Sequence, residues 1–226
     1  MDNDKEKKGE KSSDLCKHGN FKGDCSVCDK ERDRVFKKRD IEVESDGRIV
    51  LYHATIGEKL VKILEARSIK PSQETGERNW GSEGEKDDEI KKEKVYLADE
   101  KTLRSQVAPH QNFDGGRVYI LKVKVGENNL RIDEDSGYED QEDWLGSLDD
   151  LGMLSHKGEI ADFEIFDKLK YELPKDRITF YSEKIYGAES DDEAERWTRE
   201  LNEERQKNAD TEDELVREAI ESSDED

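Results

Sequence analysis

Short apolar runs alternate with polar stretches along the sequence, and each run has the length of one strand or one helix. Residues 48–52 are mostly apolar and predict a buried strand, and residues 94–98 predict another. Residues 117–125 alternate between apolar and polar positions from Lys122 onward, as expected for a half-buried strand. Further strands are predicted at residues 130–132, 159–166 and 177–182.

Helical spacing appears mainly in the first half of the ordered region. Leu60, Ile63 and Leu64 recur at helical intervals within residues 58–68, and Pro71 prevents the helix from continuing. Other helices are predicted at residues 29–40, 100–107 and 144–154, and residues 73–93 are predicted to form a surface loop. Helix appears early and strands dominate later, so we expect an α+β fold and not a regular βαβ repeat.

Length and composition indicate one globular core flanked by two charged segments. The chain has 226 residues, of which 31% are apolar, so a single core of roughly 140 residues is expected. We therefore divide the chain into an N-terminal segment (1–40), a globular domain (41–186) and an acidic tail that is part helical and part disordered (187–226). Residues 222–226 are the part of the tail predicted to be disordered.

The chain is strongly acidic, with a formal net charge of −21. Such a field repels nucleic-acid phosphates, so a nucleic-acid substrate would need a local basic patch. Residues 187–226 carry 17 acidic and 5 basic side chains, which favours a solvated tail, with a basic partner as the alternative. The N-terminus is charged and no long apolar run exists, so we expect a cytoplasmic protein with no membrane span.

Three cysteines and one histidine cluster near the N-terminus in a Cys-x-His-x6-Cys-x2-Cys pattern. They are Cys16, His18, Cys25 and Cys28. Three thiolates and one imidazole complete a tetrahedral zinc shell, and four protein ligands leave no open position, so we predict a structural zinc knuckle. The alternatives are a chance cluster and a disulfide with one remaining thiol.

Candidate chemistry lies on three separate predicted strands. His53 ends the first apolar run and is followed by a hydroxyl at Thr55, Tyr96 is central in the second, and Glu159 opens a later one. Each residue alone also has an ordinary explanation. A histidine after a strand is often an edge residue, a strand tyrosine is usually core, and a glutamate at a strand start is commonly solvated.

The carboxylate has a second candidate, Glu164, five residues after Glu159. Strand alternation directs these two side chains to opposite faces, so only one of them points into a common cleft. Glu159 is favoured because Gly158 leaves room beside it. His110 and His156 lie in polar surroundings and are predicted to be surface residues.

These segments together resemble the motifs of the histidine-tyrosine-glutamate class of ADP-ribosyltransferases, the diphtheria-toxin-like and poly(ADP-ribose)-polymerase-like branch. The resemblance covers residues 48–186 and rests on Tyr52-His53-Ala54-Thr55, Tyr96-Leu97-Ala98 and the later glutamate strand. It implies a split β-sheet with flanking helices and a cleft that binds NAD. The chain departs from the family at Ala54, where glycine is usual.

The resemblance also implies a role for each residue. His53 would hydrogen-bond a ribose hydroxyl, the backbone at Ala54 would hold the nicotinamide carboxamide, and Thr55 would add a hydroxyl contact. Tyr96 would stack on the nicotinamide ring. Glu159 would stabilise the positive charge that develops on the ribose when the bond to nicotinamide breaks.

The implied activity is transfer of ADP-ribose from NAD to a protein or nucleic-acid acceptor, with single transfer favoured over chain extension. A toxin, a defence effector and a housekeeping enzyme all fit this activity. One alternative is an RNA 2′-phosphotransferase, which also uses NAD but needs basic side chains around a phosphate, of which the second motif offers Arg104 and few others. Another is a non-catalytic interaction module that combines zinc with the acidic tail.

Overall fold

The computed structural model describes residues 25–71, 93–108, 115–133 and 143–224. Its strands are β1 (Ile49–Ile56), β2 (Lys94–Ala98), β3 (Val118–Val125), β4 (Leu130–Arg131), β5 (Met153–Lys157) and β6 (Phe163–Lys168). Its helices are α1 (Ser26–Arg39), α2 (Gly57–Ala66), α5 (Glu100–Thr102), α6 (Trp144–Leu151), α7 (Lys175–Tyr186) and α8 (Asp191–Asp224), with a π-helix η1 (Leu103–Val107) and a 3-10 helix η3 (Glu127–Asn129).

The described strands form one antiparallel sheet in the order β4-β5-β2-β1-β3-β6. This confirms the α+β class. Because successive side chains of a strand point to opposite faces, the sheet has two apolar surfaces. The larger cluster includes Leu51, Leu97 and Leu121, and the smaller one includes Ala54, Ala98 and Ile120.

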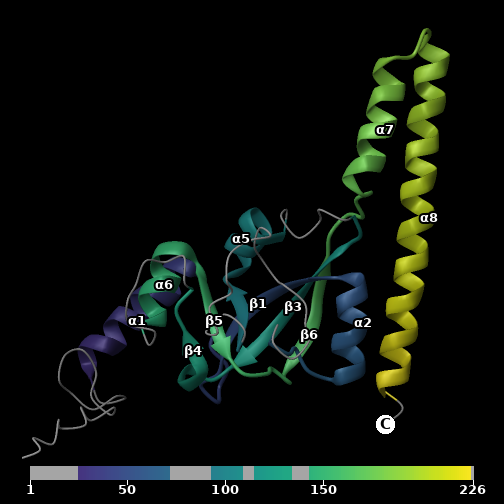
Figure 1. Cartoon of the computed structure of the whole chain (residues 1–226). Coiled ribbons are helices and arrows are strands. Elements are labelled where there is room, and N and C mark those ends of the chain that lie inside the picture. The colour runs from purple at the N-terminus through teal and green to yellow at the C-terminus, as the bar shows by residue number, and fades with distance from the viewer. Residues whose placement is uncertain (1–24, 72–92, 109–114, 134–142, 225–226) are drawn as a thin grey trace, which may run out of the picture.

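Helix α2 follows β1 directly and covers one face of the sheet. Leu60 and Leu64 point into the larger core cluster, and Figure 1 shows the C-terminal part of α8 packed on the outside of α2. Both carboxylate oxygens of Glu212 on α8 accept from the backbone N–H of Arg117, at 3.2 Å. The same carboxylate lies where a side chain on Gly57 would stand, so a larger residue there would displace Glu212.

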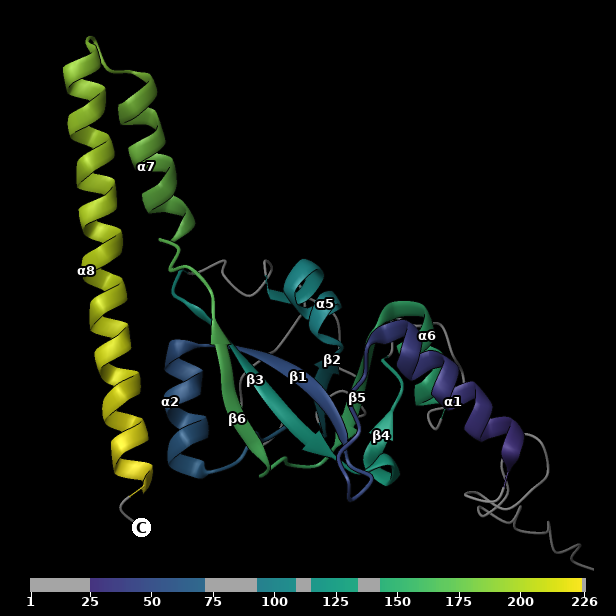
Figure 2. The same ribbon diagram turned by 180° about the vertical axis from the view of Figure 1, so that it is seen from behind.

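Helices α7 and α8 form a hairpin whose closed end projects away from the sheet (Figures 1 and 2). The strand predicted at 177–182 is therefore wrong, because these residues lie within α7. The Tyr181 hydroxyl donates to Glu204 of α8 at 2.6 Å, and the Arg177 guanidinium pairs with the same carboxylate. A short run of β-branched and aromatic residues is ambiguous between helix and strand, and the partner helix decides the outcome.

Other boundaries also differ from those predicted. The helix predicted at 144–154 ends at Leu151, and β5 was not predicted because its buried Ser155 and His156 look polar in the sequence. The strand predicted at 159–166 begins only at Phe163, so Glu159 lies in the connection between β5 and β6. The residues predicted to be disordered at 222–226 are helical as far as Asp224.

The remaining predictions of helices agree better with the structure. The helix at 29–40 corresponds to α1, and the one at 100–107 begins as α5 and continues as η1. The predicted loop at 73–93 lies almost wholly outside the described residues. Within the described chain, no helix is long and apolar enough to cross a membrane.

Candidate functional site

The two edges of β1 are paired very differently. On one side, β1 pairs with β3 along all eight of its residues, from Ile49 opposite Val125 to Ile56 opposite Val118. On the other side, the described residues contain a single pair with β2, Tyr52 opposite Ala98. The ladder between β1 and β2 therefore ends where the His53 segment begins.

His53 lies just beyond this last pair and joins the two strands through its side chain. Its Nδ1 is 2.9 Å from the backbone carbonyl oxygen of Tyr96. A carbonyl oxygen can only accept, so Nδ1 carries the hydrogen and Nε2 keeps its lone pair. Burial lowers the pKa of His53 below its ordinary value, opposed by the hydrogen bond to Tyr96 and assisted by the charge of Lys59. The ring is therefore neutral at pH 7 and its Nε2 is an acceptor.

The two residues after His53 are part of a regular, buried strand. Ala54 pairs with Ile120 and Thr55 with Tyr119, and Ala54 and Thr55 are 4% and 2% exposed. Among the described non-glycine residues, positive φ occurs at Asp40 and Arg67, so Ala54 has ordinary extended backbone. Alanine in place of glycine therefore adds no backbone strain here.

Tyr96 lies at the centre of β2 between two buried residues, Val95 and Leu97, and opposite Ser155 of β5. Val95 and Leu97 belong to the larger core cluster, so alternation directs the half-buried Tyr96 side chain to the opposite face. Ala54, the neighbour of His53 in β1, belongs to the smaller cluster. Alternation therefore directs the His53 side chain to the face of the larger cluster. The rings of His53 and Tyr96 thus flank the strand separation from opposite faces.

Glu159 lies at the end of β5 that is next to the start of β2. The N–H of Gly158 donates to the carbonyl of Glu93 at 3.1 Å, and Gly158 has a φ of 86°. The Glu159 side chain is exposed, and the Ser68 hydroxyl lies 3.3 Å from its Oε2. The structure thus brings Glu159 to the β2 side of the sheet and against the segment after α2.

Glu164 lies on the other side of β1. It is opposite Lys122 of β3, which is in turn opposite Tyr52. Two strand spacings, about 10 Å, therefore separate Glu164 from β1, on the side away from β2. The two candidate carboxylates occupy opposite flanks of the His53 strand.

His156 was predicted to be a surface residue, and this is wrong. It is 5% exposed, and its Nδ1 lies 3.2 Å from the Gly158 carbonyl oxygen. Burial lowers the pKa of His156, opposed by this hydrogen bond and assisted by the charge of Arg131. His156 therefore supports the turn that precedes Glu159. His110 lies outside the described residues.

Two of the four predicted zinc ligands can be described, because Cys16 and His18 lie outside the described residues. Cys25 is buried in the N-cap position of α1 and Cys28 lies in its first turn. A Cys-x2-Cys spacing allows two sulfurs to reach one ion. The described residues contain no cluster of three or more potential metal ligands.

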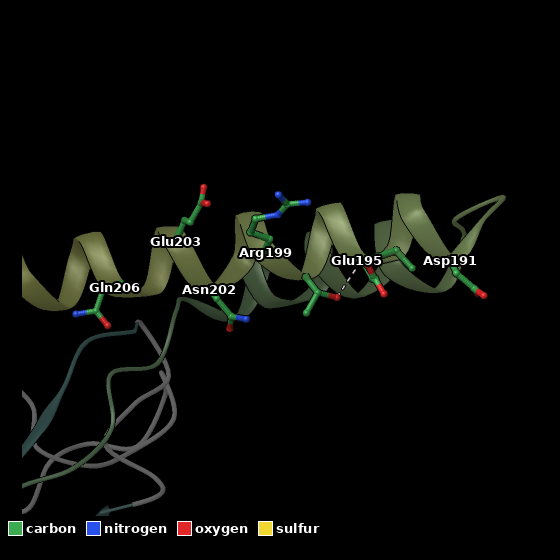
Figure 3. Close-up of a pocket in the computed structure, with 8 residues that line it drawn as sticks. Asp191, Glu195, Arg199, Asn202, Glu203 and Gln206 are labelled. Carbon is green, nitrogen blue, oxygen red and sulfur yellow. Dashed lines mark hydrogen bonds between the residues drawn. The ribbon is translucent and has the colours of Figure 1, made fainter.

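A hollow on the surface lies along α8 and is distant from these residues in the sequence and in the fold. Figure 3 shows its lining residues, which all belong to one helix, among them Glu195, Arg199 and Asn202. Because no other element supplies an opposing wall, it has the form of a shallow groove. It carries none of the candidate residues.

Similarity to other proteins does not indicate a function for this chain, so a function can be assigned only from the fold and the geometry. The chain matches no family model, no curated protein and no solved structure.

Proposed function

We propose that the domain is an NAD-dependent ADP-ribosyltransferase of the histidine-tyrosine-glutamate class. The observation that carries this proposal is the separation of β1 from β2 after the Tyr52–Ala98 pair, bridged by the His53 ring on the Tyr96 carbonyl. In the family that the chain resembles, a split sheet forms the cleft that binds NAD. The nicotinamide ribose would lie at Nε2 of His53, the ring nitrogen that does not contact the Tyr96 carbonyl.

The protonation state of His53 suits a ribose hydroxyl. Nδ1 is occupied by the Tyr96 carbonyl, and the neutral ring leaves Nε2 to accept a hydrogen bond from a hydroxyl donor. The edge of β1 at Ala54, which continues without a β2 ladder partner among the described residues, would receive the carboxamide through its backbone. Thr55 is buried beside it and would contribute its hydroxyl from within the strand.

Glu159 would act on the bond that breaks. The bond between the nicotinamide nitrogen and the ribose C1′ breaks with its electron pair leaving on nicotinamide, so positive charge develops on the ribose. A carboxylate beside that sugar stabilises the charge electrostatically. The acceptor nucleophile then forms a bond to C1′ and releases its proton. Exposure of Glu159 suits a position that a macromolecular acceptor must reach.

Zinc would serve structure and not this reaction. With Cys16 and His18, the pair Cys25 and Cys28 would close a four-ligand shell at the N-terminus of α1. Such a shell stabilises a segment too small and polar to fold alone.

The RNA 2′-phosphotransferase alternative is less well supported by the charges. Arg104 donates to Glu100 at 2.8 Å and to Asp167 at 2.7 Å. A guanidinium already paired with two carboxylates is poorly suited to bind a phosphate. The non-catalytic alternative predicts that NAD is not consumed, which the same experiment tests.

The test is incubation of the full chain with labelled NAD, following nicotinamide release and transfer of label. Glu159→Gln removes the charge and should lower turnover by about 100-fold or more. Glu164→Gln is the matched control and should retain activity. His53→Ala should weaken NAD binding and turnover together. Absence of both NAD binding and turnover in the unmodified chain, or equal turnover in the two glutamine variants, would overturn the proposal.

A further inference from the structure

We infer that Ser68 is a positioning residue for the Glu159 carboxylate, an inference that rests on the proposed function. Ser68 is 6% exposed, whereas Glu159 is exposed. The Ser68 hydroxyl has two acceptors within reach, the Ala66 carbonyl at 3.4 Å and Glu159 Oε2 at 3.3 Å. The charged oxygen is the stronger acceptor, so the hydroxyl is directed at Glu159 across a contact that is long for an O–H···O bond.

The backbone on both sides keeps these two residues together. The N–H of Ile69 donates to the carbonyl of Ile160 at 2.8 Å, and the N–H of Ile160 donates back at 2.9 Å. This reciprocal pair immediately follows both Ser68 and Glu159. It joins the segment after α2 to the connection between β5 and β6. The contact between the Ser68 hydroxyl and the Glu159 carboxylate joins the same two segments through their side chains.

The end of α2 is built to deliver Ser68 to this place. Arg67 adopts the left-handed conformation with a φ of 53°. Its N–H donates to the Leu64 carbonyl, and the Ser68 N–H donates to the Ile63 carbonyl, which is the Schellman pattern of a helix end. Glycine is usual at the left-handed position, so arginine there costs about 1 kcal/mol. The Arg67 guanidinium donates to the Ser223 carbonyl of α8 at 2.6 Å, which helps to hold this turn.

His53 and Ser68 lie close together in the sequence, and the contact between Ser68 and Glu159 links this segment to the carboxylate. β1 carries His53, α2 comes directly after it, and the end of α2 carries Ser68 to the carboxylate. One strand-helix unit would thus hold the ribose at one end and orient the charge-stabilising group at the other. Ser68 acts through Glu159 and does not itself touch the reacting atoms.

The test compares Ser68→Ala with Ser68→Thr in the full chain. Loss of one hydrogen bond to a charged group should lower kcat for nicotinamide release by roughly 10-fold, with KM for NAD unchanged. Ser68→Thr keeps a hydroxyl and should restore most of the rate. In the Glu159→Gln background, Ser68→Ala should cost much less, because the two residues act as a unit.

An unchanged kcat in Ser68→Ala would overturn the inference, as would an equal loss in the Glu159→Gln background. A separate readout does not depend on turnover. Three-bond couplings measured by NMR report whether the Glu159 side chain holds one rotamer, and they should average in Ser68→Ala. If the unmodified chain consumes no NAD, the proposed function fails and these couplings alone decide: unchanged values in Ser68→Ala would overturn the positioning role.

Discussion

The β2–β5 pair has a carboxylate beyond each end, and the two differ in almost every respect. Asp99 follows β2, where its N–H donates to the Gly152 carbonyl ahead of β5. Its side chain is buried. It accepts from the Thr102 N–H at 2.7 Å and the Thr102 hydroxyl at 3.0 Å, and it pairs with Arg39 at 3.3 Å. Glu159, beyond the other end, is exposed and has the Ser68 hydroxyl beside it.

The difference separates a structural acid from a candidate functional one. The Asp99 carboxylate accepts hydrogen bonds from Thr102 of α5 and pairs with Arg39 of α1. It therefore joins β2 to both helices and has little capacity left for a ligand. Glu159 has the Ser68 hydroxyl beside it at 3.3 Å and is otherwise exposed to solvent. The same side-chain chemistry thus stabilises the fold at one end and leaves an exposed carboxylate at the other.

The largest expected effect is the loss of Asp99. Asp99→Ala leaves Arg39 partly buried without this partner and Thr102 without its acceptor, so the free energy of unfolding should fall by about 3–5 kcal/mol. Urea denaturation measures it. Glu65→Ala, at an exposed position of α2, should stay within about 0.5 kcal/mol. A small loss in Asp99→Ala would remove the distinction between the two acids.

The glycines at the two ends of β5 offer a matched pair. Both have positive φ, 73° at Gly152 and 86° at Gly158. A side chain on Gly152 would collide with the Asp99 carboxylate and the Thr102 hydroxyl, whereas nothing lies within 4 Å at Gly158. Gly158→Ala should cost about 1 kcal/mol in unfolding free energy, for backbone strain alone. Gly152→Ala should cost at least about 1 kcal/mol more, as measured by thermal unfolding. Equal costs would contradict the close packing around Asp99.

The pH dependence of stability should report the two neutral histidines, His53 and His156. Burial lowers the pKa of His53 and of His156 from 6.5, so the unfolded chain binds these protons more readily. Stability is therefore fully present above pH 6.5 and falls as the pH decreases below that value, by at most about 1.4 kcal/mol per pH unit for each histidine.

Substitution of each histidine separates the contributions of His53 and His156 to this pH dependence. His53→Gln and His156→Gln should each flatten the dependence of the unfolding free energy between about pH 6.5 and 5, measured by urea denaturation at each pH. If the unfolding free energy of both variants depends on pH as steeply as that of the unmodified chain, neither ring is held neutral.

The smallest expected effect on stability is at Glu159 itself. Glu159→Ala should change the free energy of unfolding by no more than about 0.5 kcal/mol, because the side chain is exposed. The same variant should lose NAD turnover under the proposed function. Together with Asp99→Ala this gives opposite phenotypes for two acids on one pair of strands. A Glu159→Ala loss of about 2 kcal/mol or more would instead make Glu159 structural.

Local patterns predicted much of the sheet. The apolar run at 48–52, the tyrosine-centred run at 94–98 and the alternating run at 117–125 all correspond to strands, and the periodic segment at 58–68 corresponds to α2. These segments carry consistent signals over a full element. Prediction failed at 177–182 and around β5, where short runs were assigned to strand or helix without knowledge of the element that packs on them.

By itself, the sequence determined the α+β class and the candidate residues His53, Tyr96 and Glu159, because strand alternation, helical spacing and motif order are local properties. Only the tertiary structure decided that β1 separates from β2 at His53, that the Tyr96 carbonyl sets the tautomer of the ring, and that Ser68 meets Glu159. Each of these depends on contacts between segments tens of residues apart. Such contacts follow from how all the apolar faces are buried together, and no local pattern records them.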